Sequence, residues 1–133
     1  KRLNLEKSSI TSNRYFHQSK FEYLNINNTQ IKDLENISTQ ELHAENIYIP
    51  VMTISRKKMT ILNLKRSKIS ELVFNRSTII EEFWLNKGNI ERLKTRDGFT
   101  IEKLYLSEGR QKTKDPVLQK LIESSTEVIY QKD

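Results

Sequence analysis

The sequence predicts a parallel β-solenoid of about six turns of roughly 21 residues, closed by a C-terminal helix. Two observations support this fold class. Leu62, Phe83 and Leu104 follow one another at intervals of 21 residues. Each is followed two positions later by a second apolar residue (Leu64, Leu85 and Leu106), an alternation typical of a short half-buried strand. Stacked turns of this kind bury their apolar sides against one another.

The same spacing extends back to the start of the chain. The leading apolar residues of the six turns are separated by 21, 18, 20, 21 and 21 residues: Leu3, Leu24, Leu42, Leu62, Phe83 and Leu104. We expect one strand per turn, with parallel strands about 4.8 Å apart. The short steps, Pro50 and the basic run at 56–58 predict a loop excursion between residues 41 and 58.

A small residue follows the strand in five of the six turns, where the chain must bend back towards the core: Ser8, Thr29, Ser67, Gly88 and Gly109. Within the later turns the pattern nearly repeats at half length. The small residues Ser67, Ser77, Gly88, Gly98 and Gly109 are 10, 11, 10 and 11 positions apart.

This spacing resembles the leucine-rich repeat, in its nested 21-residue type, over residues 1 to about 109. The family usually carries Asn where Ser, Thr or Gly stands here, so we expect its ladder of side-chain bonds between turns to be weak or absent. A pentapeptide-repeat-like solenoid is the second choice. Pentapeptide coils favour small residues where this chain has Leu62, Leu72 and Phe83, and this difference favours the leucine-rich repeat.

Residues 110–133 form a second region, a polar connector followed by a helix. Asp115 is typical of an N-cap and Pro116 of the first helical position, and apolar residues then share one helical face as far as about Tyr130. We expect this helix to cover the open end of the solenoid, although it is also a candidate for binding a partner. At the other end, Leu3 and Leu5 have no covering element, so self-association through this edge is a second hypothesis.

The composition restricts the function classes. The 133 residues include no cysteine, which excludes disulfides and thiolate metal sites, and no run of apolar residues long enough to span a bilayer. The sequence contains no signal peptide and indicates no compartment; a cytoplasmic protein and a cell-surface fragment both fit. The net charge of +6 comes from residues 53–133, which hold 17 Lys/Arg against 11 Asp/Glu.

No catalytic motif is present, and we expect no enzyme activity, cofactor or metal. Glu41, His43 and Glu45 alternate on one strand face and are a possible metal or acid–base site. A metal site needs three or four ligands, and one histidine between two carboxylates is more typical of a solvated strand face.

The outward strand positions are the best candidates for binding. In a leucine-rich repeat such positions line the concave face, and here they include the only tryptophan, Trp84, with Tyr105 one turn later. Exposed aromatic residues with polar neighbours are typical of binding hot spots. The predicted partner-binding residues are Trp84, Tyr105, Asn63, Lys103, Glu82 and His43.

The sequence therefore predicts a non-enzymatic protein–protein interaction module that presents a rigid strand face. The alternative is a nucleic-acid-binding solenoid that uses the basic second half, whose cations cluster in one turn and its approach: Arg56, Lys57, Lys58, Lys65, Arg66 and Lys68. Steep salt dependence of binding would favour nucleic acid.

Overall fold

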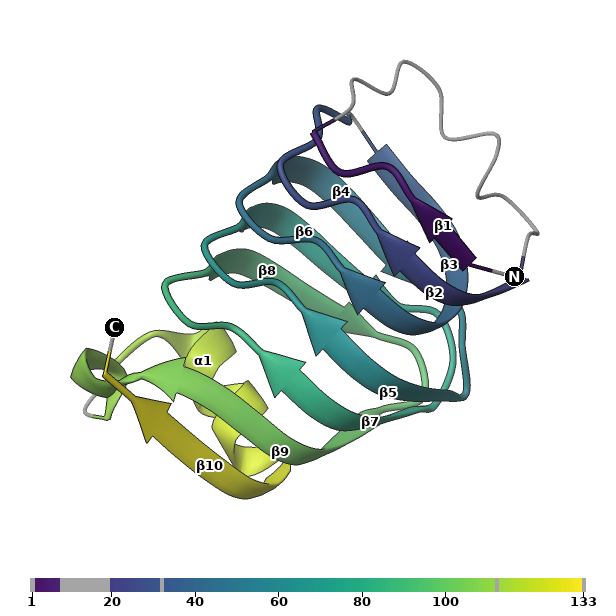
Figure 1. The fold of residues 1–133 in the computed structure, drawn as a ribbon. Coiled ribbons are helices and arrows are strands. Elements are labelled where there is room, and N and C mark those ends of the chain that lie inside the picture. Colours follow the sequence, from purple (N-terminus) through teal and green to yellow (C-terminus); the bar gives the residue numbers. More distant parts are fainter. Residues whose placement is uncertain (1, 8–19, 32, 112, 133) are drawn as a thin grey trace.

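The computed structural model describes residues 2–7, 20–31, 33–111 and 113–132, which wind into a parallel β-solenoid of about five turns (Figure 1). All strand pairs are parallel. The first sheet contains β1 (Arg2–Asn4), β2 (Lys20–Asn25), the second half of β3 (Asp33–His43), β5 (Lys58–Asn63), β7 (Thr78–Trp84), β9 (Phe99–Ser107) and β10 (Ser125–Gln131). The second sheet contains the first half of β3, β4 (Tyr48–Ile54), β6 (Lys68–Phe74) and β8 (Asn89–Thr95).

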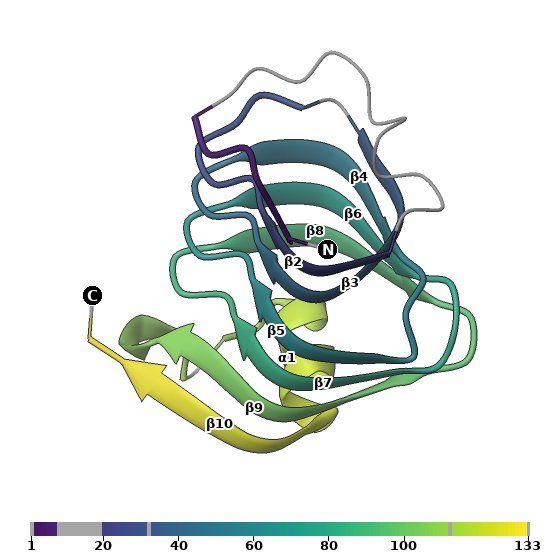
Figure 2. The same cartoon turned by 45° about the vertical axis from the view of Figure 1, so that its right-hand side comes forward.

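Each complete turn contributes two strands, one to each sheet, whereas one strand per turn was predicted from the sequence. The half-length repeat is the source of the second strand. In the first sheet Leu62 pairs with Phe83 and Phe83 with Leu104, whereas in the second sheet Leu72 pairs with Leu93. Figure 2 shows the two layers from a second side.

The hydrophobic core lies between the two sheets. Five of the six predicted leading residues are fully buried, which confirms the register: Leu24, Leu42, Leu62, Phe83 and Leu104. Leu3 is partly buried. The second sheet faces them with Leu34, Met52, Leu72 and Phe74. Because side chains alternate across a strand, the residues between these positions stand on the outer surface.

The predicted loop excursion between residues 41 and 58 does not form, because Pro50 lies inside β4 between the paired residues Ile49 and Val51. The irregular spacing has another cause. Three residues separate β4 from β5, β6 from β7 and β8 from β9, but β3 passes from the second sheet to the first without a break. The missing corner shortens this turn, which explains the 18-residue step from Leu24 to Leu42.

The chain leaves the first sheet through a repeated tight turn. One residue in each turn has a positive φ between 54° and 62°: Lys7, Asn28, Asn46, Arg66 and Lys87. After Asn28, Arg66 and Lys87 the amide of the next residue donates to a carbonyl three positions back, as Ser67 does to Leu64 at 3.2 Å and Gly88 to Leu85 at 2.9 Å.

The small residues after these turns have two roles. A Cβ on Gly88 would lie 2.6 Å from the carbonyl oxygen of Leu64 in the preceding turn, so the close approach of the two backbones requires glycine. The hydroxyl of Ser67 donates to the carbonyl of Ala44 and accepts the amide of Ile47 at 3.2 Å. A side-chain bond between turns is therefore present at Ser67, where we expected it to be weak or absent. Ser8 lies outside the described residues.

The C-terminal region contains one helix, α1 (Pro116–Glu123), after a short 3-10 turn, η1 (Glu108–Arg110). The N-cap is confirmed, since the Asp115 carboxylate accepts the amide of Val117 at 2.9 Å. α1 contacts β8, β9 and β10, and its residues Leu118 and Leu121 are buried at the end of the stack (Figures 1 and 2).

The helix ends at Glu123, well before Tyr130, and the remaining residues form β10. Val128, Ile129 and Tyr130 favour a strand, and pairing satisfies backbone groups along the edge of β9. Val128 pairs with Leu104 and Tyr130 with Leu106, so both extend the inward rows of the first sheet. The last turn is thus a β–α–β unit in which α1 replaces a strand of the second sheet.

Candidate interaction surface

A row of side chains runs along the outer face of the first sheet, one from each turn. In register it consists of Asn4, Asn25, His43, Asn63, Trp84 and Tyr105, which we call the outer row. Ile129 of β10 follows Tyr105 in the same register. The row therefore brings together four of the six residues predicted to bind a partner.

Trp84 and Tyr105 form a face-to-face stack with ring centroids 3.5 Å apart and planes inclined by 2°. The ammonium of Lys65 lies 5.1 Å from the centroid of the Trp84 ring, and the indole Nε1–H donates to the Glu82 carboxylate at 3.1 Å. Both rings are half-buried. Because ring faces in such a row point at the neighbouring turns, the exposed parts of the pair are mainly the ring edges.

The asparagines of the outer row close turns of the backbone. The side-chain oxygens of Asn4, Asn25 and Asn63 accept the amide two residues later, at 3.0, 2.9 and 3.2 Å respectively. Such Asx bonds stabilise the exit from each strand. Asn63 is only 5% exposed, so its side chain serves the fold and offers little surface to a partner.

His43 is held by its neighbours on three sides. Asn63 Nδ2 donates to His43 Nδ1 at 3.1 Å, His43 Nε2 lies 3.0 Å from Glu41 Oε1, and the Tyr23 ring lies 5.3 Å away, centroid to centroid. The second acid of the sequence pattern points elsewhere, because Glu45 pairs with Lys65 and Arg66, each at 3.7 Å. Among the described residues, no group of three potential metal ligands occurs.

Glu82 and Lys103 occupy the adjacent outward row, where they pair in register beside Trp84 and Tyr105. Glu82 is half-buried, whereas Lys103 is exposed. The row continues to Glu127 on β10. The aromatic pair is thus bordered by alternating charges.

The basic cluster predicted from the sequence is divided between the two ends of β5. Arg56 and Lys57 precede this strand and Lys58 begins it, and Lys58 pairs with Glu81 at 3.1 Å. Lys65, Arg66 and Lys68 lie beyond the far end, about 20 Å away for a strand of this length. The six cations therefore do not form one continuous patch.

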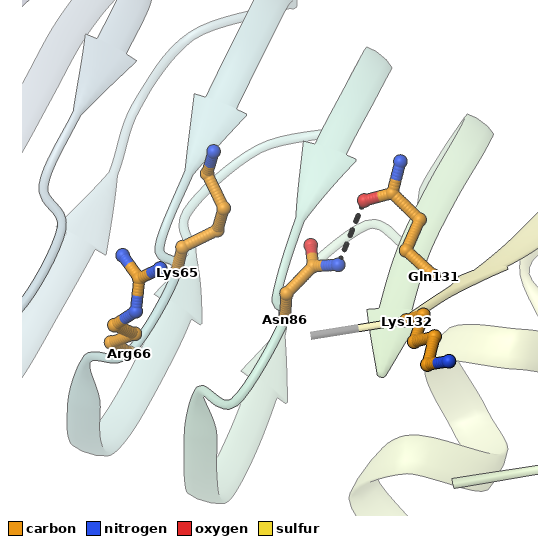
Figure 3. Close-up of a pocket in the computed structure, with 5 residues that line it drawn as sticks. All are labelled: Lys65, Arg66, Asn86, Gln131 and Lys132. Atoms are coloured by element: carbon orange, nitrogen blue, oxygen red, sulfur yellow. Dashed lines mark hydrogen bonds between the residues drawn. The ribbon is translucent and has the colours of Figure 1, made fainter. Parts of the chain in front are cut away.

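A shallow hollow of about 270 Å³ lies at the end of the first sheet (Figure 3). Lys65, which lines it, also lies 5.1 Å from the Trp84 ring centroid, so the hollow is close to the aromatic pair. It is lined by residues from three turns: Lys65, Arg66, Asn86, Gln131 and Lys132. Lys65 and Arg66 were predicted as surface cations from the sequence, whereas Gln131 and Lys132 were not predicted to lie here. Gln131 and Lys132 reach this place only because β10 pairs with β9, which the predicted helix did not allow.

Comparison of the chain with protein-family models, curated proteins and solved structures finds no match. In the part of the chain that the structure describes, no helix is long and apolar enough to cross a membrane. The function must therefore be inferred from the surface itself.

Proposed function

We propose that this chain is a non-enzymatic protein–protein interaction module that presents the outer face of its first sheet to a partner. The stacked pair of Trp84 and Tyr105 is the observation that carries the proposal. It places two large aromatic side chains on the outer surface, where neither fills the core, beside Lys65, Glu82 and Lys103. Aromatic residues bordered by charged groups are typical of interface hot spots.

A protein partner fits this pair better than a nucleic acid. Single-stranded nucleic acids bind aromatic platforms through free ring faces on which their bases stack. Here one face of Trp84 meets Tyr105, and its other side meets Lys65. The ring edges remain accessible for packing against protein side chains.

Rigid display is the proposed mechanism. The outer row is fixed by the hydrogen bonds between parallel strands, and the rings are ordered before any partner arrives. Binding then costs little side-chain entropy, which leaves more of the contact energy for affinity. The half-buried positions of both rings are consistent with this pre-ordering.

We retain the leucine-rich repeat as the proposed repeat class. The large side chains Leu62, Phe83 and Leu104 are fully buried at consecutive turns, where a pentapeptide coil favours small residues. The 21-residue step between them supports the same choice.

The test is the affinity for protein partners captured from the source organism, measured again with purified components. Trp84→Ala should weaken binding by about 2 kcal/mol, as truncation of a hot spot does. It should lower the free energy of unfolding by only about 1 kcal/mol, through the lost stacking.

Tyr48→Ala is the matched control, because Tyr48 is 56% exposed on the second sheet and belongs to the opposite face. It should leave the affinity unchanged. Equal losses in the two variants would contradict the proposed face. Binding whose affinity falls steeply with salt and survives Trp84→Ala would instead indicate nucleic acid.

A further inference from the structure

The hollow beside the aromatic pair contains a buried acceptor that the protein does not use. Asn86 is 5% exposed, and its Nδ2 donates to Gln131 Oε1 at 2.9 Å. Among the described residues, no group donates to Asn86 Oδ1. Figure 3 shows this oxygen on the side of Asn86 that faces Lys65. A buried amide oxygen without a donor is costly, so the site favours a ligand that brings an N–H or O–H group.

The charge of the hollow favours an anion at the same place. Lys65, Arg66 and Lys132 line it, and the nearby carboxylate of Glu45 is shared between Lys65 and Arg66 at 3.7 Å each. One carboxylate shared by two cations leaves an excess of positive charge. The ammonium of Lys132 points away from Asn86 and adds to the positive rim (Figure 3).

We propose that the hollow binds an acidic residue in an extended segment of the partner protein, a proposal that rests on the interaction function above. The ligand carboxylate contacts Lys65 and Arg66 on the side away from Glu45, and a backbone N–H of the segment donates to Asn86 Oδ1. Charge-assisted hydrogen bonds to a guanidinium are among the strong ones in proteins. One Asp or Glu residue supplies both the anion and the donor within a few ångströms.

The Asn86–Gln131 pair also suits this ligand. Because Asn86 Nδ2 is engaged by Gln131 Oε1, the Asn86 amide offers a ligand its acceptor Oδ1. A phosphodiester supplies acceptors only and meets the acceptor oxygen less well. The hollow is therefore better matched to a peptide than to a nucleic acid backbone.

The probe is a capped pentapeptide of alternating glycine and aspartate, titrated into the folded protein. Trp84 is the only tryptophan, and the Lys65 ammonium lies 5.1 Å from its ring centroid, so movement of this lysine on binding should change the tryptophan emission. We expect a saturable change with the aspartate peptide and none with the same peptide carrying asparagine.

The matched variants are Arg66→Asn and Lys87→Asn. Arg66 and Lys87 occupy the same left-handed position of consecutive turns, and asparagine tolerates that conformation. Each variant removes one cation, but only Arg66 lines the hollow. Arg66→Asn should weaken the aspartate peptide about tenfold, the loss of one charged hydrogen bond, whereas Lys87→Asn should change the affinity less than about twofold.

Equal losses in the two variants would overturn the proposal, because they would show a general effect of net charge. Binding of an oligouridylate with the Arg66 dependence, without binding of the peptide, would also overturn it. If the peptide does not bind but partner capture depends on Trp84, the site proposed in the hollow is wrong and the proposed interaction face stands. If the peptide binds but no partner depends on Trp84, the interaction face is wrong and the hollow stands.

Discussion

The outer row of the first sheet has a polar half and an aromatic half in one continuous register. In the polar half, Asn4, Asn25 and Asn63 each close the turn that follows their strand. In the aromatic half, Trp84 and Tyr105 have no such bond to offer and stack on each other. The same position of the repeat thus serves the backbone in one half and presents a surface in the other.

The left-handed position of the tight turns does not follow this division. Asn28 and Asn46, in the polar half, adopt it at little cost because asparagine tolerates this conformation. Lys7 and Arg66, in the same half, and Lys87, in the aromatic half, adopt it with long side chains at a greater cost. The difference between the halves therefore lies in the outer row, and it supports the binding role proposed for the aromatic pair.

The largest expected effect tests the strand register, which directs Trp84 outward and its neighbour Leu85 into the core. Leu85 is fully buried, so Leu85→Ala should lower the free energy of unfolding by about 2–5 kcal/mol through the cavity it leaves. Urea denaturation followed by circular dichroism measures this loss.

Ile79→Ala is the control on β7, the strand that leads to Leu85, since Ile79 is 41% exposed and its truncation should cost less than about 1 kcal/mol. A Leu85→Ala loss as small as that of Ile79→Ala would mean that the inward and outward faces are assigned wrongly.

A second prediction concerns how much the asparagines of the polar half stabilise the fold. Asn63→Ala removes the acceptor of the Lys65 amide and the donor to His43, so it should cost about 1–3 kcal/mol of stability. Asn4→Ala removes the same kind of turn bond at an exposed position and should cost well under 1 kcal/mol by the same principle. Chemical denaturation of the two variants measures the difference. If Asn63→Ala destabilises the protein no more than Asn4→Ala does, the buried Asn63 side chain does not stabilise the fold.

The smallest expected effect concerns the strained turns. Lys87→Asn should raise the free energy of unfolding by about 0.5–1 kcal/mol, because asparagine relieves the left-handed conformation at φ 56°. Thermal unfolding checks the sign, and Asn46→Lys is the reverse substitution at φ 54° and should destabilise. A lower stability of Lys87→Asn would show that the lysine side chain contributes a contact that outweighs its strain.

The periodic apolar residues predicted most of the fold, whereas the surface residues predicted little of it. Leu62, Phe83 and Leu104 predicted the stacked turns because burial imposes a strict spacing on large apolar side chains. The second sheet was not predicted, although the half-length repeat reflects it, because an L-x-x-L spacing is compatible with one strand per turn or with two.

β10 was missed because Val128 and Ile129 fit a helical face as well as a strand, and the free edge of β9 decided between them. Because β10 was predicted as part of a helix, the hollow was not predicted either. Gln131 meets Asn86 across 45 positions of the chain, and no local pattern reports a contact between segments so far apart. The outward direction of Trp84 followed from alternation, but its stacking distance depends on the exact register of two strands.

The corner that β3 lacks shows how such a molecule can change length during evolution. The turn without these three residues is shorter, yet Leu24, Leu42 and Leu62 still stand in one row. Insertions and deletions at the corners are therefore absorbed locally, and the spacing of the surface side chains is preserved. The corners at residues 55–57, 75–77 and 96–98 can therefore vary in length without disturbing the outer row.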